Sequence, residues 1–174
     1  MSLEIDVREH EWRASLGLGP ILRFDLLTAL LPISATEWTS AAGLTASAIE
    51  LVNAEPDYFD VNYEDSGVHV RRAVRPIVHP IGVRIATNHW RQGLEWAGRF
   101  AGYAERTLMV SENTSDLEQA RLEAMYFGVG LVVQRPNELD EIVSHPAPFM
   151  PERFSAASWY FSEQLYGKWM ERSS

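Results

Sequence analysis

The chain of 174 residues has no cysteine, which excludes a disulfide framework, a thiolate nucleophile and a cysteine-ligated zinc site. It also lacks an apolar run long enough to cross a bilayer, and residues 1–11 are polar and acidic, without the apolar segment of a secretory signal. We therefore expect a cytoplasmic protein. The apolar fraction of 46% is sufficient for the buried core of one ordinary domain, with at most a small extension.

Positive charge is also scarce, because 15 lysines and arginines are set against 24 aspartates and glutamates, for a net charge of −9. A surface that is basic throughout is thereby excluded, and nucleic-acid binding would need a local basic patch. The histidines show no paired metal-ligand spacing; they are His10, His69, His79, His89 and His145. Neither a phosphate-binding loop ending in Gly-Lys-Ser/Thr nor a nucleophile-elbow serine is present, so we expect no cofactor.

The first part of the chain is predicted to be mainly helical. Residues 1–19 mix charged and apolar side chains and end in a glycine–proline break, which is typical of a loose arm or a short docking element. Pro20 suits the first turn of a helix that Pro32 ends. Two short helices separated by Gly43 are expected over 34–53.

A β-hairpin is predicted after these helices. Residues 58–63 and 68–72 have the composition of strands, and they flank a turn at 64–67. Three helices followed by a hairpin is the outline of a winged helix.

The helix that would enter a DNA groove in such a fold is acidic. It follows its expected cap, Thr45, and carries Glu50 but no lysine or arginine to contact phosphates or guanine edges. Helices packed on a sheet are therefore the preferred interpretation. A winged-helix transcriptional regulator that uses the hairpin arginines Arg71 and Arg72 is an alternative.

The stretch 82–134 alternates short strands with helices, which predicts parallel pairing through right-handed crossovers and hence an α/β sheet. Asn88 is expected to cap the first helix, whose apolar side chains recur at helical spacing. Ser115 and Glu118 form a capping box for the second helix, which Gly128 ends. Strands are expected over 81–87, 107–110 and 129–133.

Three segments of this stretch carry a family resemblance. They are Gly82-Val83-Arg84-Ile85-Ala86-Thr87, Tyr103-Ala104-Glu105-Arg106-Thr107-Leu108-Met109-Val110 and Gly128-Val129-Gly130-Leu131-Val132-Val133. With the helices between them, they resemble the second half of the PD-(D/E)XK nuclease domains. The resemblance covers residues 68–135 and implies a restriction-endonuclease-like mixed sheet flanked by helices.

In that superfamily an aspartate and a glutamate on adjacent strands hold Mg²⁺, and a neighbouring lysine positions the attacking water. The resemblance puts the glutamate position at Arg84, the lysine position at Ala86 and the aspartate position near Arg72. Arginine cannot ligate a divalent cation, and alanine has no polar group. Asp60 in the hairpin or Glu95 in the following helix could replace one acid, but the site would stay incomplete. The resemblance therefore implies a domain without a metal and without nuclease activity.

Several arginines fall on or beside the strands that would frame this position. They are Arg71, Arg72, Arg75, Arg84 and Arg91. A metal-free site lined by guanidinium groups could bind phosphate through bidentate hydrogen bonds. The alternative is that these arginines lie on alternate faces and pair with surface carboxylates. Our leading hypothesis is a catalytically inactive nuclease-like domain that binds DNA or assists a nucleic-acid-processing or regulatory system.

The C-terminal part is rich in aromatic residues, and Pro151 is expected to open a helix there. The rings that could meet a protein partner, or a second copy in a homodimer, are Trp159, Tyr160, Tyr166 and Trp169. The alternative is that every ring is core. A protein-interaction scaffold with no nucleic-acid role is therefore the rival function.

These expectations divide the chain into four parts. They are an N-terminal arm at 1–19, a helical region with a hairpin at 20–72, a nuclease-like α/β core at 73–148 and an aromatic helix at 149–174.

Overall fold

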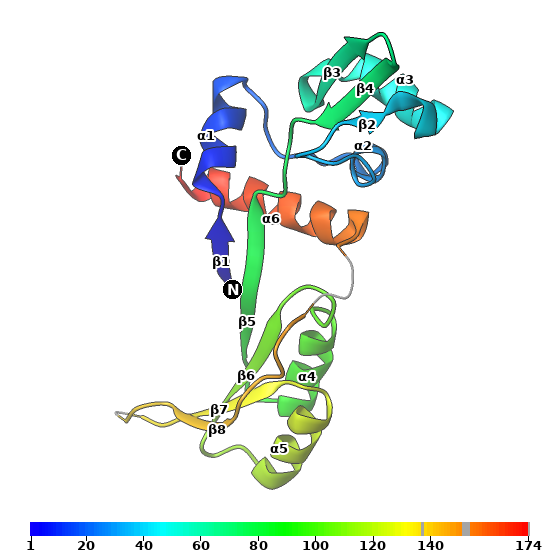
Figure 1. Cartoon of the computed structure of the whole chain (residues 1–174). Helices are drawn as coiled ribbons and strands as arrows, with labels where there is room; N and C mark the ends of the chain where they lie inside the picture. The colour runs from blue at the N-terminus through cyan, green and yellow to red at the C-terminus, as the bar shows by residue number, and fades with distance from the viewer. Residues whose placement is uncertain (137, 151–153, 174) are drawn as a thin grey trace. The chain divides into compact units, whose positions relative to one another are not determined.

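The structure is a computed structural model that describes residues 1–136, 138–150 and 154–173 (Figure 1). The fold is α/β, and the chain divides into two compact units, each treated separately below. Unit 1 comprises Met1–Glu4 and Pro80–Arg153, and unit 2 comprises Ile5–His79 and Phe154–Ser174. The C-terminal helix thus groups with the N-terminal helices. In the part of the chain that the structure describes, no helix is both long enough and apolar enough to cross a membrane.

Unit 1 is built on a five-stranded sheet of order β1-β5-β6-β7-β8. Its strands are Ser2–Ile5 (β1), Val78–Ala86 (β5), Glu105–Ser111 (β6), Gly130–Gln134 (β7) and Glu141–Ser144 (β8). Strands β5, β6 and β7 pair in parallel, which confirms the expected parallel pairing, whereas β8 is antiparallel to β7 and was not predicted. The sheet is therefore mixed.

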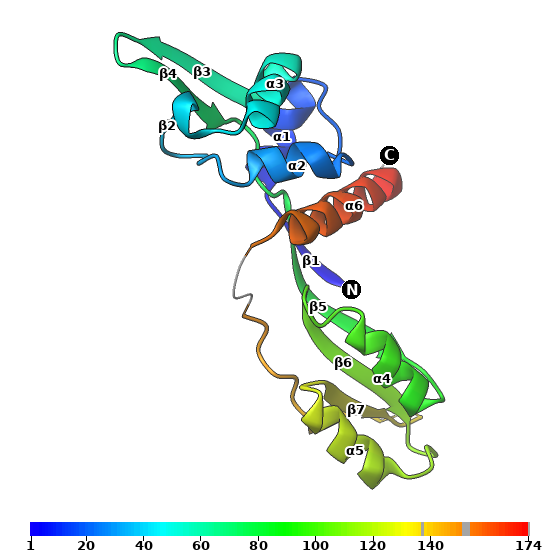
Figure 2. The same ribbon diagram turned by 90° about the vertical axis from the view of Figure 1, so that its right-hand side faces the viewer.

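Two helices, α4 (Trp90–Gly98) and α5 (Leu117–Tyr126), cover one face of this sheet (Figure 2). Alternate strand residues such as Leu108, Val110 and Leu131 point toward the helices and form an apolar core with them. The helices contribute Trp90, Leu94, Ala97, Ala120 and Ala124 to this core. Strand residues of the opposite parity lie on the uncovered face.

The ends of these helices differ in part from the expected caps. Thr87, not Asn88, bonds the backbone at the start of α4, because its Oγ1 accepts from the His89 amide at 3.0 Å. The capping box is wrong, since Glu118 instead accepts from its i+3 neighbour Arg121 at 2.6 Å, a charge-assisted bond. Gly128 follows α5 with φ of +65°, as expected for a helix-ending glycine.

Unit 2 combines helices with a three-stranded antiparallel sheet of order β2-β4-β3. Its helices are Val7–Ser15 (α1), Phe24–Leu30 (α2), Ala46–Ala54 (α3) and Ala156–Ser173 (α6), with 3₁₀ turns at Ala41–Gly43 (η1) and Pro56–Tyr58 (η2). Its strands are Thr39–Ser40 (β2), Phe59–Glu64 (β3) and Gly67–Arg72 (β4). The predicted hairpin is confirmed. So is the cap of α3, where Thr45 accepts from the Ala48 amide at 3.3 Å.

Residues 1–19, predicted to be a loose arm or a short docking element, hold β1 and α1. Asp6 caps α1 by accepting from the amides of Arg8 and Glu9, each at 3.1 Å. The inward face of α1 carries charged side chains, so apolar periodicity could not reveal the helix. The next helix begins at Phe24, later than Pro20 suggested. Pro151, expected to open the last helix, lies outside the described residues.

Candidate anion-binding site

A buried network of charged side chains joins α1 to α6 in unit 2. Arg13 is fully buried and donates from Nε to Glu9 at 3.0 Å and from Nη1 to Glu163 at 2.8 Å. Burial alone would lower the pKa of Arg13, but the hydrogen bonds and charges of Glu163 and Glu9 raise it above its ordinary value. Glu163, also fully buried, accepts from Nε1 of Trp159 at 2.9 Å. The network therefore connects α1 with α6 through bonds to the charged groups.

The same network fixes the backbone of Arg75. Nη2 of Arg13 donates to the Arg75 carbonyl at 2.7 Å, and the Arg75 amide donates to Glu9 at 2.9 Å. Both polar backbone groups of this residue are thus satisfied by buried charged side chains. The side chain of Arg75 is exposed and forms no ion pair with any residue that the structure describes.

Arg72 differs from Arg13, because its surroundings lower its pKa whereas those of Arg13 raise it. Its guanidinium stacks over the Trp159 ring, with 4.8 Å from Cζ to the ring centroid. Its Nε and Nη1 are shielded from solvent and have no hydrogen-bond partner among the described residues. Burial lowers the pKa of Arg72, the charge of Arg75 lowers it further, and Glu9 partly opposes the shift. A buried donor without a partner costs about 1–3 kcal/mol, so Arg72 is a strained point of the unit.

Arg72 and Arg75 line one cavity of about 450 Å³ in unit 2. His79 and the loop 31–36 contribute to its wall, and the Arg72 amide donates to the Ser34 carbonyl at 3.0 Å. Asp6 is the carboxylate of the wall, and it already accepts the two amide bonds that cap α1. We call this cavity the Arg72–Arg75 site. Its two guanidinium groups outnumber its one carboxylate, so it can attract an anion.

The other arginines of the predicted nucleic-acid site do not join this pair. Arg71 bonds Asp60 at 2.7 Å and lies over the Trp38 ring at 4.8 Å. Adjacent residues of a strand point to opposite faces, which separates Arg71 from Arg72. Arg84 and Arg91 belong to unit 1, where Arg91 lies over the Trp90 ring at 4.2 Å. Pairing with a surface carboxylate, the alternative interpretation, holds for Arg71.

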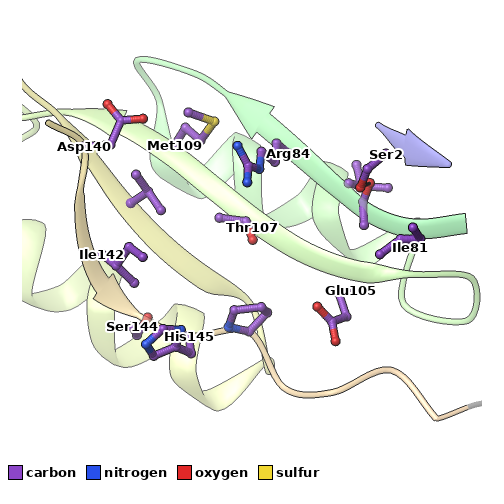
Figure 3. A pocket seen from close by; sticks show the side chains of 14 residues that line it. Ser2, Ile81, Arg84, Glu105, Thr107, Met109, Asp140, Ile142, Ser144 and His145 are labelled. Atoms are coloured by element: carbon purple, nitrogen blue, oxygen red, sulfur yellow. Dashed lines mark hydrogen bonds between the residues drawn. The ribbon is translucent and has the colours of Figure 1, made fainter. Parts of the chain in front are cut away.

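Arg84 lies on the uncovered face of the unit 1 sheet, beside a cavity of about 410 Å³ (Figure 3). Its register partner on β6 is Thr107, and Glu105 and Asp140 also line the cavity. Ala86 is on the same face of β5, two residues further on. The charges here are mixed, because two carboxylates and one arginine line the cavity, so it is a weaker anion site.

Neither of the acids considered as replacements lies at this cavity. Asp60 is paired with Arg71 in unit 2, and Glu95 is on α4 with Arg99 at 3.6 Å. Within the described residues, no three histidine or carboxylate side chains gather closely enough to hold a metal ion.

The predicted partner-binding rings of the C-terminal helix are largely internal. Trp159 and Tyr166 are fully buried in unit 2, so for them the core interpretation holds and a partner surface is wrong. Tyr160 is partly buried and meets Phe24 edge to face at 6.1 Å. Trp169 is partly buried and stacks on Tyr166 at 6.0 Å. A partner role for Tyr160 and Trp169 stays a prediction.

The residues that sequence reasoning missed are Glu9, Arg13 and Glu163, which position the site without lining it. One signal was present in the sequence: Glu9 and Arg13 are spaced i, i+4, as are Trp159 and Glu163. Comparison of the chain with protein-family models, curated proteins and solved structures found no significant match.

Proposed function

We propose that the protein is a metal-independent binding module for nucleic acid and that the Arg72–Arg75 site holds a phosphate group. The observation that carries this proposal is the shielded guanidinium of Arg72, whose Nε and Nη1 have no partner among the described residues. Phosphate oxygens, like carboxylate oxygens, are strong acceptors for a guanidinium group, because its donors match their spacing.

Electrostatics supports the same conclusion. In a protein of net charge −9, the structure keeps Arg72 close enough to Arg75 for the second charge to lower the pKa of the first. Such like-charge pairs destabilise a protein unless an anion relieves the repulsion. Bound phosphate would therefore be stabilised by both arginines and would stabilise unit 2 in return.

The footprint of this site is small. Asp6 in the wall and the net charge of −9 would repel a backbone laid along the protein, so we expect one or two phosphates to be engaged. Each phosphate contributes about −0.9 to the slope of log K against log salt on duplex DNA. We therefore expect a slope of about −1 to −2, shallower than that of a protein with a basic groove.

The fold interpretations that accompany this proposal are a winged helix in unit 2 and a degenerate nuclease-like domain in unit 1. The order α2, β2, η1, α3, β3, β4 and the strand order β2-β4-β3 support the first. The parallel strands β5 to β7 with their helices support the second. In this interpretation α3 does not read DNA, because it has no lysine or arginine, and unit 1 performs no metal chemistry.

The test is fluorescence anisotropy of labelled single-stranded and duplex DNA at several salt concentrations without metal. Arg75→Gln and the double variant Arg72→Gln/Arg75→Gln should weaken binding and flatten the salt dependence. Arg84→Gln and Arg91→Gln remove the same charge from unit 1 and serve as matched controls.

Three outcomes would count against the proposal. One is no binding even at low salt, and another is wild-type binding by the Arg75→Gln variant. The third is loss of binding in Arg84→Gln alone, which would move the phosphate contact to the uncovered face of the unit 1 sheet. Circular dichroism of each variant shows whether a loss reflects unfolding.

A further inference from the structure

Unit 2 also carries an apolar groove, formed between α3 with η1 on one side and the β3–β4 hairpin on the other. Its cavity is about 540 Å³. We call it the hairpin groove, and its main apolar residues are Leu44, Ile49, Val61, Tyr63, Val68 and Val70. The groove does not include Arg72 or Arg75, so it is separate from the anion site.

The register of the hairpin explains how this apolar surface arises. Val61 lies opposite Val70, and Tyr63 lies opposite Val68, so these side chains share one face with the buried Phe59. Burial decreases outward along this face. Val70 is 2% exposed, whereas Val61 is 36% and Tyr63 is 78% exposed. The apolar surface that is buried in the core of unit 2 thus extends along the hairpin as a solvent-exposed apolar strip.

The helix on the other side of the groove extends the same strip. Ile49 of α3 is 40% exposed and Val68 of β4 is 39% exposed, and both line the groove. A contiguous apolar surface bordered by polar residues is typical of a protein-interaction site, whereas single exposed apolar side chains are not. The groove therefore needs an occupant with apolar side chains.

Charge identifies the kind of occupant. Between Arg23 and Arg71 the chain has no lysine or arginine. Its acids in that stretch are Asp25, Glu37, Glu50, Glu55, Asp57, Asp60, Glu64 and Asp65.

Three of these acids border the groove in sequence. Glu50 follows Ile49 on α3, and Asp65 is at the hairpin turn beside Ser66, which lines the groove. Glu64 ends β3 next to this turn, but its carboxylate accepts from Asn62 at 2.7 Å on the strand face opposite Tyr63. These three acids, all exposed, form what we call the acidic border of the groove.

Arg71, the nearest basic residue in the hairpin, is already paired with Asp60. The remaining arginine of the hairpin, Arg72, stacks on Trp159 and does not line the groove.

We propose that the hairpin groove docks an apolar segment of a partner protein that is flanked by lysines or arginines. The apolar side chains of that segment would cover Tyr63, Val61 and Ile49, and its cations would face the acidic border. A second copy of this chain fits less well, because two acidic borders would repel each other. Nucleic acid is repelled for the same reason, so this groove and the Arg72–Arg75 site select ligands of opposite charge.

The experiment uses the full chain and two fluorescent peptides with the same apolar core of leucine, isoleucine and phenylalanine. One peptide is flanked by arginines and the other by glutamates. We expect the arginine-flanked peptide to bind at least about tenfold more tightly in an anisotropy titration. Glu50→Gln/Glu64→Gln/Asp65→Asn should remove most of that preference and keep the protein folded, since these side chains are on the surface.

Apolar contact is tested by Tyr63→Ser and Ile49→Ser, which should each weaken binding of the arginine-flanked peptide about tenfold. Tyr126→Ser is the matched control, because Tyr126 is 84% exposed in unit 1. Arg72→Gln/Arg75→Gln should bind the peptide normally, which separates this proposal from phosphate binding.

Equal binding of the two peptides, or no binding of either, would overturn the proposal. So would a Tyr63→Ser variant that binds as well as Tyr126→Ser. The remaining possible occupant is a second copy of this chain, which sedimentation of the wild-type protein tests. If the wild-type protein were a dimer and Tyr63→Ser a monomer, the groove would be assigned to the second copy.

Discussion

The two units build their interiors with different chemistry. In unit 1 the interior is an apolar layer between a sheet and two helices, with Leu108 and Leu131 completely buried. In unit 2 an apolar cluster surrounds a network of charged groups, in which Arg13 and Glu163 are completely buried. Every buried charged side chain of the described residues belongs to unit 2.

The difference explains why the candidate site is in unit 2. A buried ion pair adds little net stability compared with apolar packing, but it fixes orientation, because its hydrogen bonds tolerate few geometries. Here the bonds from Arg13 and Glu9 hold the backbone of Arg75 on both sides. Arg72 makes no hydrogen bond to this network, and its Nε and Nη1 have no partner in the part of the chain that the structure describes. Among the described residues of unit 1 no charged side chain is buried, and its uncovered face mixes arginine with carboxylates.

The largest effect is expected from Glu163→Ala. This change leaves the buried guanidinium of Arg13 with one carboxylate and removes the partner of Trp159. Breaking a buried pair costs about 3–5 kcal/mol, so the free energy of unfolding should fall by about that amount. Urea denaturation followed by tryptophan fluorescence measures it. Glu118→Ala, which removes the exposed partner of Arg121 in unit 1, is the control and should change little.

Leu108→Ala should destabilise unit 1 by about 3 kcal/mol, through lost burial and a cavity in the apolar layer. The same denaturation experiment gives the value. If Leu108→Ala were harmless while Glu163→Ala was severe, unit 1 would not depend on apolar packing, and the contrast between the units would fail.

Gly93→Ala should destabilise the contact between α4 and β6. An added Cβ would lie 2.4 Å from Cδ1 of Leu108 and 2.6 Å from Cγ2 of Thr87. Overpacking of this kind costs about 1–3 kcal/mol. Gly98→Ala in the same helix is the control, because its Cβ would meet nothing within 4 Å. The midpoint of thermal unfolding should fall for Gly93→Ala and not for Gly98→Ala. Equal midpoints for the two variants would mean that α4 can move away from the sheet.

The smallest effect concerns alkaline pH. Burial raises the pKa of Tyr166 above its ordinary value of about 10, although the charge of Arg13 opposes the shift, and burial likewise raises the pKa of Tyr58. The folded chain therefore keeps protons that the unfolded chain has lost. The contribution of these two tyrosines to stability should be constant below about pH 10 and should decline as pH rises through their folded pKa values.

Tyr166→Phe should make that decline shallower, because it removes one of the two groups responsible. Tyr126→Phe, at an exposed position in unit 1, is the control for loss of a tyrosine hydroxyl group. Denaturation curves at a series of alkaline pH values provide the comparison. An identical slope in Tyr166→Phe and the wild-type protein would show that Tyr166 is not the source.

The sequence predicted unit 1 better than unit 2 for a physical reason. Apolar side chains at strand and helix spacing, such as Leu108 and Val110, report directly which face is buried. Helix α1 buries Glu9 and Arg13, so a search for apolar periodicity passes over it. The capping box at Ser115 and Glu118 failed because Arg121 competes for Glu118, an effect of local charge that the motif ignores.

The candidate site was predictable only in part. Arg71 and Arg72 are neighbours on a predicted strand, so their opposite directions follow from strand geometry. The pairing of Arg71 with Asp60 follows from the hairpin register. The contact between Arg72 and Trp159 joins residues far apart in the chain, and no local pattern encodes it.

The most direct test of the phosphate site is nuclear magnetic resonance of the arginine Nε–H groups during titration with inorganic phosphate, against sodium chloride at equal ionic strength. Arg72→Gln and Arg75→Gln assign the two signals. We expect the signals of Arg72 and Arg75 to shift saturably with phosphate, while that of Arg13, already bonded to Glu9, stays fixed. An unchanged Arg72 signal, or equal shifts with chloride, would contradict the account.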